Sequence, residues 1–598
     1  MRVPPEDVPP GPGSGPGRGL PLPPELAEEA TPEAMSVLVG LADPARVPGP
    51  GGGTEQVLGR GRQRGLSRAL AARRWPLFAV LAVQAVLSLR LVWSNTAFQD
   101  EGLYLWSGHL ELSHLLHHTR IPDFATDFSG APVSYPPVGA VADSIGGLAG
   151  ARILSLAFML VATTLLHGVT RRFFASKASA FFAAALFAGA GSVQFLGAFA
   201  TYDAMALMLL ALATWLAVRA SFCGPAARFA LIAAAAVILV LANATKYASI
   251  LFDPVVLAVA LLSVWRLRGR GAGLAAGAWM AVATLLILAG AYRLGGPSYA
   301  QGIKFSTLSR ADGADPVLSV LMASARWAGI VAVLAVVGAL IISFAWRNGP
   351  TTALAWALTG AVFLAPLEQA RLHTFTSLFK HVGYGMWFAS AAGGYVLASL
   401  PRAIGPAKSR AILRTGTVAV VLAAVLGVVV ADAQYRDWPD SRGLSTTLSS
   451  LEKPGGRYLA EDYDVEAYYL RRSVRWPQWS DTWSFAYADP RSGALLQNAP
   501  AYADAIRHRY FTVIVLAFWD TYPVDRLIAA DINQYGGYRL TAVIGFRTDA
   551  GDSAYRIWTL IPLKAHSPVR SRHRTSHEPG RGRLSAGGAR PGWPSRSR

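Results

Sequence analysis

The chain has 598 residues, of which 53% are hydrophobic and only 15% are charged. Soluble proteins carry about 25% charged residues, and the mean hydropathy here is +0.34. This composition excludes a large soluble globular protein and indicates a multi-span membrane protein. The net charge of +19 could suggest nucleic-acid binding, but cytoplasmic loops of membrane proteins retain Lys and Arg, so we expect no nucleic-acid partner.

The two ends of the chain differ from its centre in composition. Residues 1–72 are rich in Pro, Gly, Ala and Arg, and we expect a disordered cytoplasmic segment. Residues 563–598 are predicted to be a disordered basic tail. The first apolar segment is long enough for a full span, so no cleavable signal peptide is expected. A single cysteine, Cys223, excludes an intramolecular disulfide and a multi-cysteine metal site.

Residues 73–432 are predicted to form the transmembrane domain. Its long apolar runs approach the roughly 20 residues that a spanning helix needs. The hydropathy fits about eleven spans: 75–93, 150–168, 178–197, 203–219, 228–243, 248–265, 273–292, 324–345, 351–366, 383–400 and 413–431. The apolar stretch 136–148 is too short to cross and indicates a re-entrant or interfacial helix.

Loop charges predict the orientation. With the N-terminus inside, the inner loops contain Arg and Lys but no Asp or Glu, and every acidic residue between 94 and 432 falls on the outer side. The Lys and Arg bias follows the positive-inside rule. An odd number of spans then places residues 433–562 outside, where strands at 511–519, 538–546 and 555–560 and helices at 466–472 and 502–509 predict a small extracytoplasmic α/β domain.

Two adjacent carboxylates, Asp100 and Glu101, follow the first span by a few residues. Half-desolvated acids at a membrane surface are costly to keep, so the pair suggests chemistry there. The alternative is a solvated loop. We take Asp100 and Glu101 as the candidate catalytic residues.

Further polar residues on the same face are candidates for substrate binding. A carboxylate can accept a proton from a hydroxyl, and cations can neutralise a leaving phosphate. Arg152, Arg371 and Lys246 could instead extend toward lipid headgroups. The candidates are Tyr104, Asp123, Asp127, Arg152, Asp203, Lys246, Arg371 and His373.

Glu111, His114 and His118 share a spacing that could hold a metal on one helix face. An amphipathic helix lying on the membrane is the favoured interpretation, so we assign no metal ligand and no cofactor, and leave a divalent metal open. The sequence also lacks a phosphate-binding Gly-rich loop with Lys-Ser/Thr. A site that faces outward would not normally meet soluble nucleotide donors, so its activated substrate should arrive on a lipid.

The acid pair followed by Tyr104, a Pro-Pro step at 136–137 and Arg152 at the start of the second span resemble the GT-C superfamily of membrane glycosyltransferases. The nearest branch is similar to protein O-mannosyltransferases and aminoarabinose transferases. Three further segments are similar to actinobacterial members: Asp-Glu-Gly-Leu-Tyr, Ala-Thr-Tyr-Asp-Ala-Met-Ala and Asn-Ala-Thr-Lys-Tyr-Ala. The resemblance covers about residues 75–432.

This resemblance implies transfer of a sugar from a polyprenyl-phosphate donor to a hydroxyl acceptor on a cell-envelope glycan, lipid or protein. The transfer would occur with inversion, at the outer face of the membrane. It places the family's catalytic Asp on Asp100 and its arginine on Arg152. The chain departs from aminoarabinose transferases at 102–103, which read Gly-Leu instead of Thr-Arg, and at 134–136, which read Ser-Tyr-Pro instead of Glu-Lys-Pro. Lys246, Arg371 or Arg152 would then have to bind the phosphate.

Two other functions compete with this one. A transporter or lipid flippase would use midplane charges and broken, repeated spans, whereas the charges here gather at the outer interface. A non-catalytic scaffold would leave the acid pair unexplained.

Overall fold

The computed structural model describes residues 59–346, 348–403, 406–549 and 551–562. For residues 59–74, 400–403 and 406–415 it describes the backbone alone. Disorder predicted for residues 1–58 and 563–598 lies outside the described residues. Residues 59–72 were expected to share that disorder, but their backbone is helical. They form the first part of helix α2 (Gly59–Val92), which continues into the first span.

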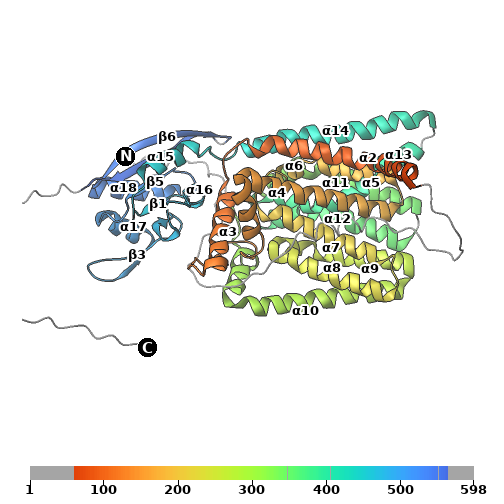
Figure 1. Cartoon of the computed structure of the whole chain (residues 1–598), viewed down its shortest axis with the longest axis horizontal. Coiled ribbons are helices and arrows are strands. Elements are labelled where there is room, and N and C mark those ends of the chain that lie inside the picture. Colours follow the sequence, from red (N-terminus) through yellow and green to blue (C-terminus); the bar gives the residue numbers. More distant parts are fainter. Residues whose placement is uncertain (1–58, 347, 404–405, 550, 563–598) are drawn as a thin grey trace, which may run out of the picture. The chain divides into compact units, whose positions relative to one another are not determined.

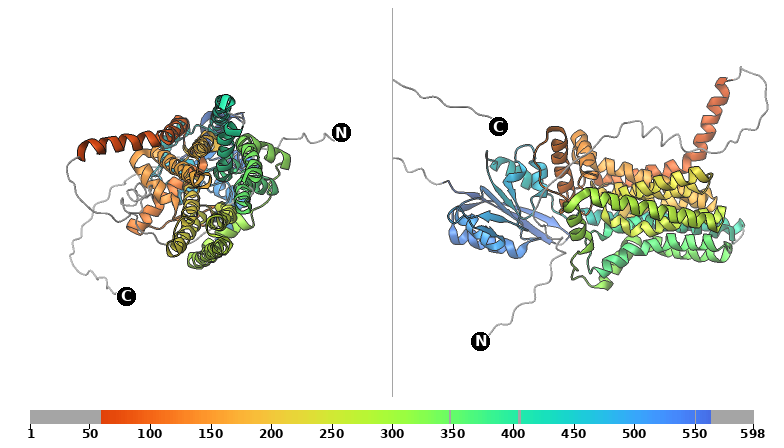
Figure 2. Two further views of the ribbon diagram at one scale, coloured as in Figure 1. Left: turned by 90° about the vertical axis from the view of Figure 1, so that its right-hand side faces the viewer. Right: turned by 90° about the horizontal axis from the view of Figure 1, so that it is seen from below.

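Long helices run side by side through the membrane part of the chain (Figure 1, Figure 2). They follow α2 in this order: α4 (Tyr135–Phe174), α5 (Lys177–Gly189), α6 (Gly191–Leu196), α7 (Tyr202–Ala220), α8 (Pro225–Thr245), α9 (Asp253–Arg268), α10 (Arg270–Ile303), α11 (Val317–Trp346), α12 (Gly349–Arg371), α13 (Leu378–Ala403) and α14 (Pro406–Tyr435). Two short helical turns, Tyr247–Phe252 and Lys304–Leu308, precede α9 and follow α10.

Nine helices within the described residues are long and apolar enough to cross a membrane. The polytopic helical fold class is therefore confirmed, although two of the eleven expected spans do not meet this measure. The expected span 178–197 is divided between α5 and α6, because the backbone turns extended at Ala190. The expected span 383–400 falls on α13, whose Gly, Ser and Tyr residues lower its hydropathy.

Helix α4 contains the short apolar stretch at 136–148. This stretch is helical, and it is separated from the long remainder of α4 by non-helical backbone at Gly146 and Gly147. Gly147 has a φ of +61°, a left-handed conformation that glycine adopts without a steric penalty. The break allows the first turns of α4 to take a direction different from the span that follows.

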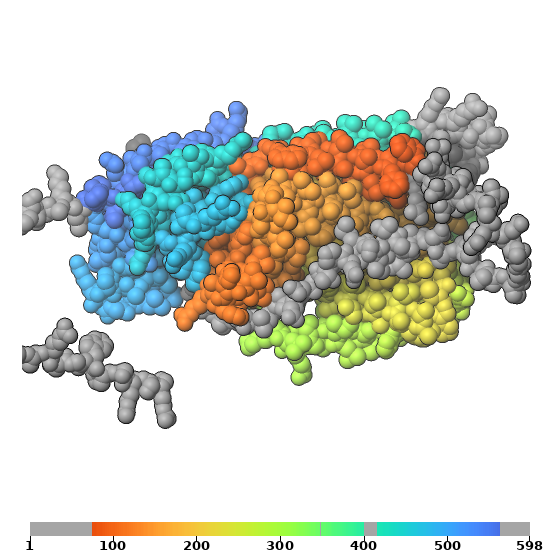
Figure 3. All heavy atoms as spheres, in the orientation of Figure 1, coloured from red at the N-terminus to blue at the C-terminus, as the bar shows by residue number. Residues whose placement is uncertain are grey.

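Helix α3 (Gln99–His117) lies between the bundle and the C-terminal strands (Figure 1). About half of its residues are buried, so much of this helix is covered by the rest of the chain. Leu103 and Trp106 belong to a hydrophobic core that also contains Tyr458 and Val513 of the C-terminal region. On the face shown in Figure 3, atoms of this orange segment adjoin the blue C-terminal region.

A buried polar network reinforces this contact. Asp143 of α4 accepts hydrogen bonds from Tyr468 and Arg471, the latter at 2.7 Å. The ring of His109 on α3 also lies 2.7 Å from Asp143. Three elements, α3, α4 and the segment at 468–471, are thereby held together near the middle of α3. The chain through Leu560 forms one compact unit. The boundary predicted at residue 433 therefore marks a change from membrane helices to a mixed sheet within that unit.

The C-terminal region is a mixed sheet with helices. Its elements are α15 (Arg442–Leu451), β1 (Tyr458–Ala460), α16 (Asp464–Tyr469), a turn at Trp476–Gln478, β2 (Trp479–Ser480), β3 (Ala486–Ala488), β4 (Leu495–Gln497), α17 (Asn498–Arg507), β5 (Val513–Leu516), α18 (Tyr522–Tyr535), β6 (Tyr538–Thr548) and β7 (Gly551–Leu560). The five-stranded sheet has the order β2-β1-β5-β7-β6, and β3 pairs with β4 separately. Strands β2, β1 and β5 are parallel, and β7 and β6 are antiparallel additions.

Strand β5 is buried on both faces. Val513 and Val515 pack into the core shared with α3, whereas Ile514 and Leu516 pack into a second core with α17 and α18. This two-residue alternation is the normal geometry of a strand covered on both sides. The three strands and two helices expected here are present, with α15, α18, β1, β2, β3 and β4 in addition.

Candidate active site

The first turn of α3 places Asp100 and Glu101 in opposite environments. The Glu101 side chain is fully buried, whereas 26% of the Asp100 side chain is exposed. Successive residues on a helix point about 100° apart, so the two carboxylates face different neighbours. They form two separate clusters.

The first, which we call the anchor cluster, consists of Glu101 and Arg152. Arg152 donates to the two carboxylate oxygens of Glu101 at 2.8 and 2.6 Å. It also donates to the carbonyl oxygens of Val92, Asn95 and Thr96 at 2.8–3.0 Å. A guanidinium has five N–H donors, and all five are used here.

Glu101 is equally saturated. Its carboxylate accepts from the backbone N–H of Ala200 at 2.8 Å and from that of Phe98 at 3.1 Å, in addition to Arg152. The anchor cluster therefore fixes the start of α3 to the end of α2 and to the loop before α7. The expectation that Arg152 binds phosphate is wrong in this arrangement, because its donors already have protein acceptors.

The second cluster, which we call the charge cluster, consists of Asp100, Asp203, Lys246, Arg310 and Lys380. Lys380 forms an ion pair with Asp100, and Lys246 lies 3.1 Å from Asp203. Asp100, Asp203 and Lys380 come from the first turns of α3, α7 and α13, and Lys246 caps the end of α8. The two ion pairs are within electrostatic range of each other.

Arg310 supplies a third cation. It lies in the loop before α11 and acts electrostatically on Lys380. Burial lowers the pKa of Arg310 from its usual value, and the side chain makes no hydrogen bond or ion pair within the described residues. The cluster thus contains three cations and two carboxylates. Glu368, which pairs with Arg371, also acts electrostatically on Arg310, but the N–H donors of Arg310 remain able to bind an anion.

Three tyrosines line the charge cluster. Tyr104 donates to the Tyr202 hydroxyl at 2.7 Å, and Tyr384 donates to the backbone oxygen of Asp203 at 3.1 Å. The Lys246 ammonium lies 4.5 Å from the centre of the Tyr202 ring. Burial raises the pKa of Tyr104 well above its ordinary value, so its hydroxyl stays neutral. These side chains shape the site without supplying charge.

Other predicted residues lie apart from this cluster. Asp123 accepts from Ser298 and from the backbone N–H of Ala125, and Asp127 follows in the same loop. Arg371 is 64% exposed and pairs with Glu368 one turn earlier. His373 lies 3.1 Å from the carbonyl oxygen of Asp315. None of these four is among the charged groups that act on Lys246 or Lys380.

The spacing of Glu111, His114 and His118 does not produce a metal cluster. His118 is the left-handed residue that ends α3, and the His114 ring is 2.6 Å from the carbonyl oxygen of Thr119. Burial raises the pKa of Glu111 to about 7. In the described part of the chain, three potential metal ligands converge only at Asp489, Asp504 and His508, distant in sequence from the acid pair.

Gly102 explains one departure from aminoarabinose transferases. A Cβ at this position would lie 2.9 Å from the backbone oxygen of Asp464 and 3.1 Å from the Cα of Val465. A larger side chain would push α3 away from α16. The Gly-Leu sequence after the acid pair thus permits close packing of the C-terminal region, at the position where Thr-Arg would offer a cation.

Sequence reasoning missed Arg310 and did not place Lys380 at the site. Arg310 lies in a loop with no motif around it, and Lys380 is 280 positions from Asp100. The one sequence signal that could have identified Lys380 as a site residue is that no acidic residue lies near it in the sequence. The assembled site has an accessible carboxylate beside three cations, which suits proton acceptance next to a phosphate.

Known structures share this fold. The chain matches ArnT from Cupriavidus metallidurans, solved with undecaprenyl phosphate bound and in the apo state, with a TM-score of 0.53 and 15% identity over 81% of this chain and 98% of ArnT. Arabinofuranosyltransferase AftD from Mycobacteria matches with a TM-score of 0.46 and 16% identity, over 82% of this chain and 40% of AftD. No family model and no curated protein sequence matches.

The chain shares the fold of ArnT. The resemblance drawn from the sequence is therefore confirmed at the level of the fold. Together with its nine apolar helices, this fold makes the chain a multi-pass membrane protein.

Proposed function

We propose that this protein is an integral-membrane glycosyltransferase. It moves a sugar from a polyprenyl-phosphate donor to a hydroxyl acceptor at the outer face of the membrane, with inversion. The observation that carries the proposal is the charge cluster, in which the partly exposed Asp100 lies beside a surplus of positive charge. The shared fold with a protein solved with undecaprenyl phosphate supports the donor class.

In the proposed reaction, Asp100 accepts the proton of the acceptor hydroxyl. The acceptor oxygen attacks the anomeric carbon from the side opposite the phosphate, so the configuration inverts. The bond between that carbon and the phosphate oxygen breaks, and its electron pair leaves with the polyprenyl phosphate. Arg310 and the two lysines stabilise the growing charge, which is a large effect where water is excluded.

The donor phosphate also changes the state of Asp100. In this structure the carboxylate pairs with Lys380. A phosphate placed between Lys380 and Arg310 would compete for that ammonium and leave Asp100 available to the acceptor. Glu101 cannot be released in the same way, because its partner Arg152 is buried and every N–H donor of that guanidinium already has an acceptor. We assign it a positioning role.

The outer-face location follows from the predicted topology. The start of α7, the end of α8 and the start of α13 carry Asp203, Lys246 and Lys380, and all three ends lie outside when the N-terminus is inside. A substituted-cysteine experiment on a Cys223→Ser background tests this. An engineered cysteine near Arg268 should be inaccessible to a membrane-impermeant reagent added from outside. Labelling at this position would show that the orientation is opposite to the proposed one.

The direct test of function uses purified protein in nanodiscs with a labelled polyprenyl-phosphate sugar and a cell-envelope extract as acceptor. We expect consumption of the donor, release of polyprenyl phosphate and label on the acceptor. Mass spectrometry would then identify the sugar linkage. Movement of intact donor between leaflets without cleavage would support the flippase alternative and contradict the proposal.

A further inference from the structure

One buried side chain at the charge cluster has no role in the reaction described above. His381 follows Lys380 in the first turn of α13 and is 9% exposed. Three cations act electrostatically on its ring: Lys246, Lys380 and Arg310. The Nε2 atom of His381 is buried and has no hydrogen-bond partner within the described residues. Leaving a buried polar atom without a partner is costly, so a ligand that supplies the missing partner would be bound favourably.

The other ring nitrogen determines where the hydrogen of the imidazole lies. Gln369 of α12 places its side-chain amide nitrogen 2.9 Å from Nδ1 of His381. Because an amide nitrogen can only donate, Nδ1 accepts, and the neutral ring carries its hydrogen on Nε2. A second proton would add a fourth positive charge beside the three cations, so the neutral ring is favoured. In the described part of the chain no cation donates to Nε2, as expected for an atom that is itself a donor.

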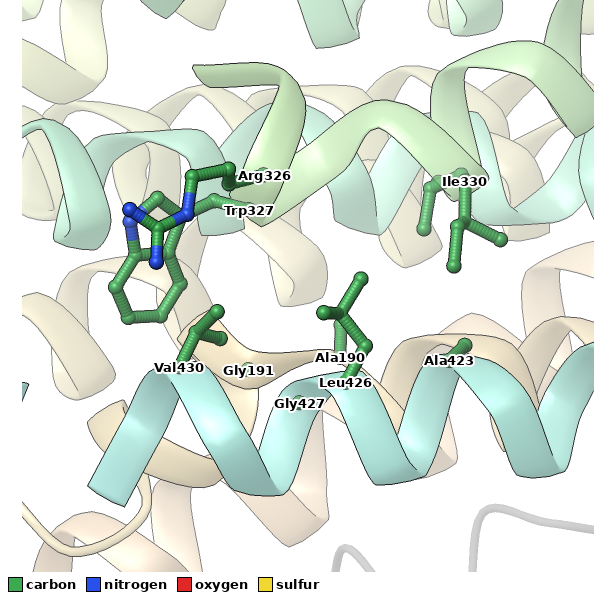
Figure 4. Close-up of a pocket in the computed structure, with 10 residues that line it drawn as sticks. Ala190, Gly191, Arg326, Trp327, Ile330, Ala423, Leu426, Gly427 and Val430 are labelled. Atoms are coloured by element: carbon green, nitrogen blue, oxygen red, sulfur yellow. The ribbon is translucent and has the colours of Figure 1, made fainter. Parts of the chain in front are cut away.

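Neighbouring side chains fix this ring and the helix turn that carries it. Gln369 is itself buried, and the ring of Tyr384 packs edge-on against that of His381, with centres 6.5 Å apart. The Phe379 ring, in the same turn of α13, lies 6.1 Å from the Trp327 ring. Trp327 lies in the seam between α11, α14 and the start of α6 (Figure 4), where about 20 Å³ is free, roughly the room for one water. The start of α13 therefore has little room to shift.

A fixed N–H donor among cations suits an anion. The charges of the two lysines and Arg310 attract a phosphate but do not by themselves fix its orientation. A lysine ammonium has three donors that rotate, whereas the N–H of an imidazole held by Gln369 has one direction. A hydrogen bond to an ionised oxygen is shorter and stronger than one between neutral groups. His381 is thus suited to fix the position of one phosphate oxygen.

We propose that the Nε2–H of His381 donates a hydrogen bond to an oxygen of the donor phosphate, and that Gln369 is a positioning residue that holds the ring in the required tautomer. This inference rests on the proposed function and adds a neutral donor to the three cations of the charge cluster. His381 transfers no proton in the reaction. Its hydrogen bond strengthens as negative charge grows on the departing polyprenyl phosphate, so it contributes to donor binding and to turnover.

Two substitutions at position 381 separate the roles of the two ring nitrogens. The side-chain amide of glutamine reaches about as far as Nε2, and that of asparagine about as far as Nδ1. His381→Gln therefore keeps a donor for the phosphate, whereas His381→Asn keeps the contact with Gln369 alone. We expect His381→Asn to weaken binding of polyprenyl phosphate about 10- to 100-fold in a nanodisc titration, the usual value of a hydrogen bond to a charged group. His381→Gln should recover most of that loss.

The controls separate a contact with phosphate from a general effect on folding. Polyprenol has the same chain without the phosphate, and its binding should be equal in wild type and His381→Asn. His117→Asn makes the same substitution at an exposed histidine of α3 and should bind polyprenyl phosphate like wild type. Unchanged binding of polyprenyl phosphate by His381→Asn would overturn the proposal. Equal losses in His381→Asn and His381→Gln, or an equal loss of polyprenol binding, would also overturn it.

The tautomer is measured on the wild-type protein, so this test does not depend on how the variants fold. Nuclear magnetic resonance of ¹⁵N-histidine distinguishes hydrogen on Nε2 from hydrogen on Nδ1. We expect the His381 signals to show an Nε2–H that shifts when polyprenyl phosphate is added and does not shift with polyprenol. Hydrogen on Nδ1 would overturn the proposal. Both readouts measure binding, so phosphate bound through His381 without any sugar transfer would contradict the proposed function and leave this inference standing.

Discussion

The anchor cluster and the charge cluster begin at adjacent residues and differ in almost every physical respect. Glu101 and Arg152 are fully buried, and each donor of the arginine has an acceptor. Asp100 is partly exposed, and its cluster carries more cations than carboxylates. A saturated buried pair can hold elements in place but has no capacity for a substrate. An unsaturated, accessible cluster can bind one.

This difference shows why chemical type alone does not identify a catalytic carboxylate. Both side chains are acids at a membrane surface, and both have a basic partner. The number of uncommitted donors and acceptors around each one separates structural from chemical roles. The predictions below test that separation, from the largest effect to the smallest.

Replacing the accessible carboxylate should cause the largest loss of activity. Asp100→Asn removes the proton acceptor, and general-base catalysis is worth about 10²–10⁴ in rate. We expect turnover to fall by that factor while the thermal midpoint changes little. Turnover is measured by transfer from a labelled donor, and near wild-type turnover would remove Asp100 from the mechanism.

Replacing the buried carboxylate should instead cause the largest loss of stability. Glu101→Gln leaves the Arg152 guanidinium buried without its anion, a change that typically costs about 3–5 kcal/mol. Thermal unfolding in detergent should show a clearly lower midpoint, with a smaller effect on turnover than that of Asp100→Asn. An unchanged midpoint would show that the anchor cluster does not hold α3.

The third prediction concerns Arg310, which makes no hydrogen bond or ion pair in the part of the chain that the structure describes. Arg310→Gln should raise KM for the donor and lower turnover, together about 10- to 100-fold, because a hydrogen bond to a charged group is worth about 1.5–3 kcal/mol. Arg371→Gln is the matched control, since Arg371 is exposed and already paired with Glu368. Equal effects of the two variants would contradict the assignment of Arg310 and restore the sequence-based expectation for Arg371.

Another buried carboxyl, that of Glu466, sharpens the comparison. Glu466 in α16 has no cation beside it, its Oε2 has no hydrogen-bond partner among the described residues, and burial raises its pKa to about 8. The nearby charges of Asp464 and Glu461 act in the same direction. The folded state therefore keeps a proton that the unfolded state releases, and stability should fall as pH rises from ~4.5 to ~8.

The variant Glu466→Gln should remove the part of that decline that Glu466 contributes. Its thermal midpoint should exceed that of wild type at the alkaline end of this range and approach it at the acidic end. The measurement is thermal unfolding across the range in one buffer system. A wild-type midpoint that rises with pH through this window, and is unaffected by the substitution, would contradict the buried, unpaired state of Glu466.

Hydropathy predicted the membrane helices because each must bury about 20 apolar residues in lipid, and the two-residue pattern predicted β5 to β7. It did not find β1 and β2, which are only two or three residues long. Strand β1 depends on pairing with β5, and β2 on pairing with β1. Sequence analysis also grouped Arg152 with the candidates for phosphate binding, whereas the structure pairs it with Glu101 in the anchor cluster. The carbonyl oxygens that occupy Arg152 belong to a turn whose geometry is not encoded in any local pattern.

The charge cluster was predicted in part. Asp100, Asp203 and Lys246 were expected at the outer face, and the structure brings them together. Their actual pairing depends on how α3, α7, α8 and α13 pack, which single-sequence patterns do not specify. Arg310 has no local signal, because a loop arginine has the same sequence appearance whether it faces solvent or a site.

Donor binding by the Asp100→Asn variant tests the central claim most directly. Asp100 occupies Lys380 when no donor is present, so removing its charge should free that ammonium for phosphate. We predict that Asp100→Asn binds polyprenyl phosphate at least as tightly as wild type in a nanodisc titration, while single-turnover transfer is lost. Weaker binding in proportion to the lost transfer would contradict the account, because Asp100 would then hold the donor rather than act on the acceptor.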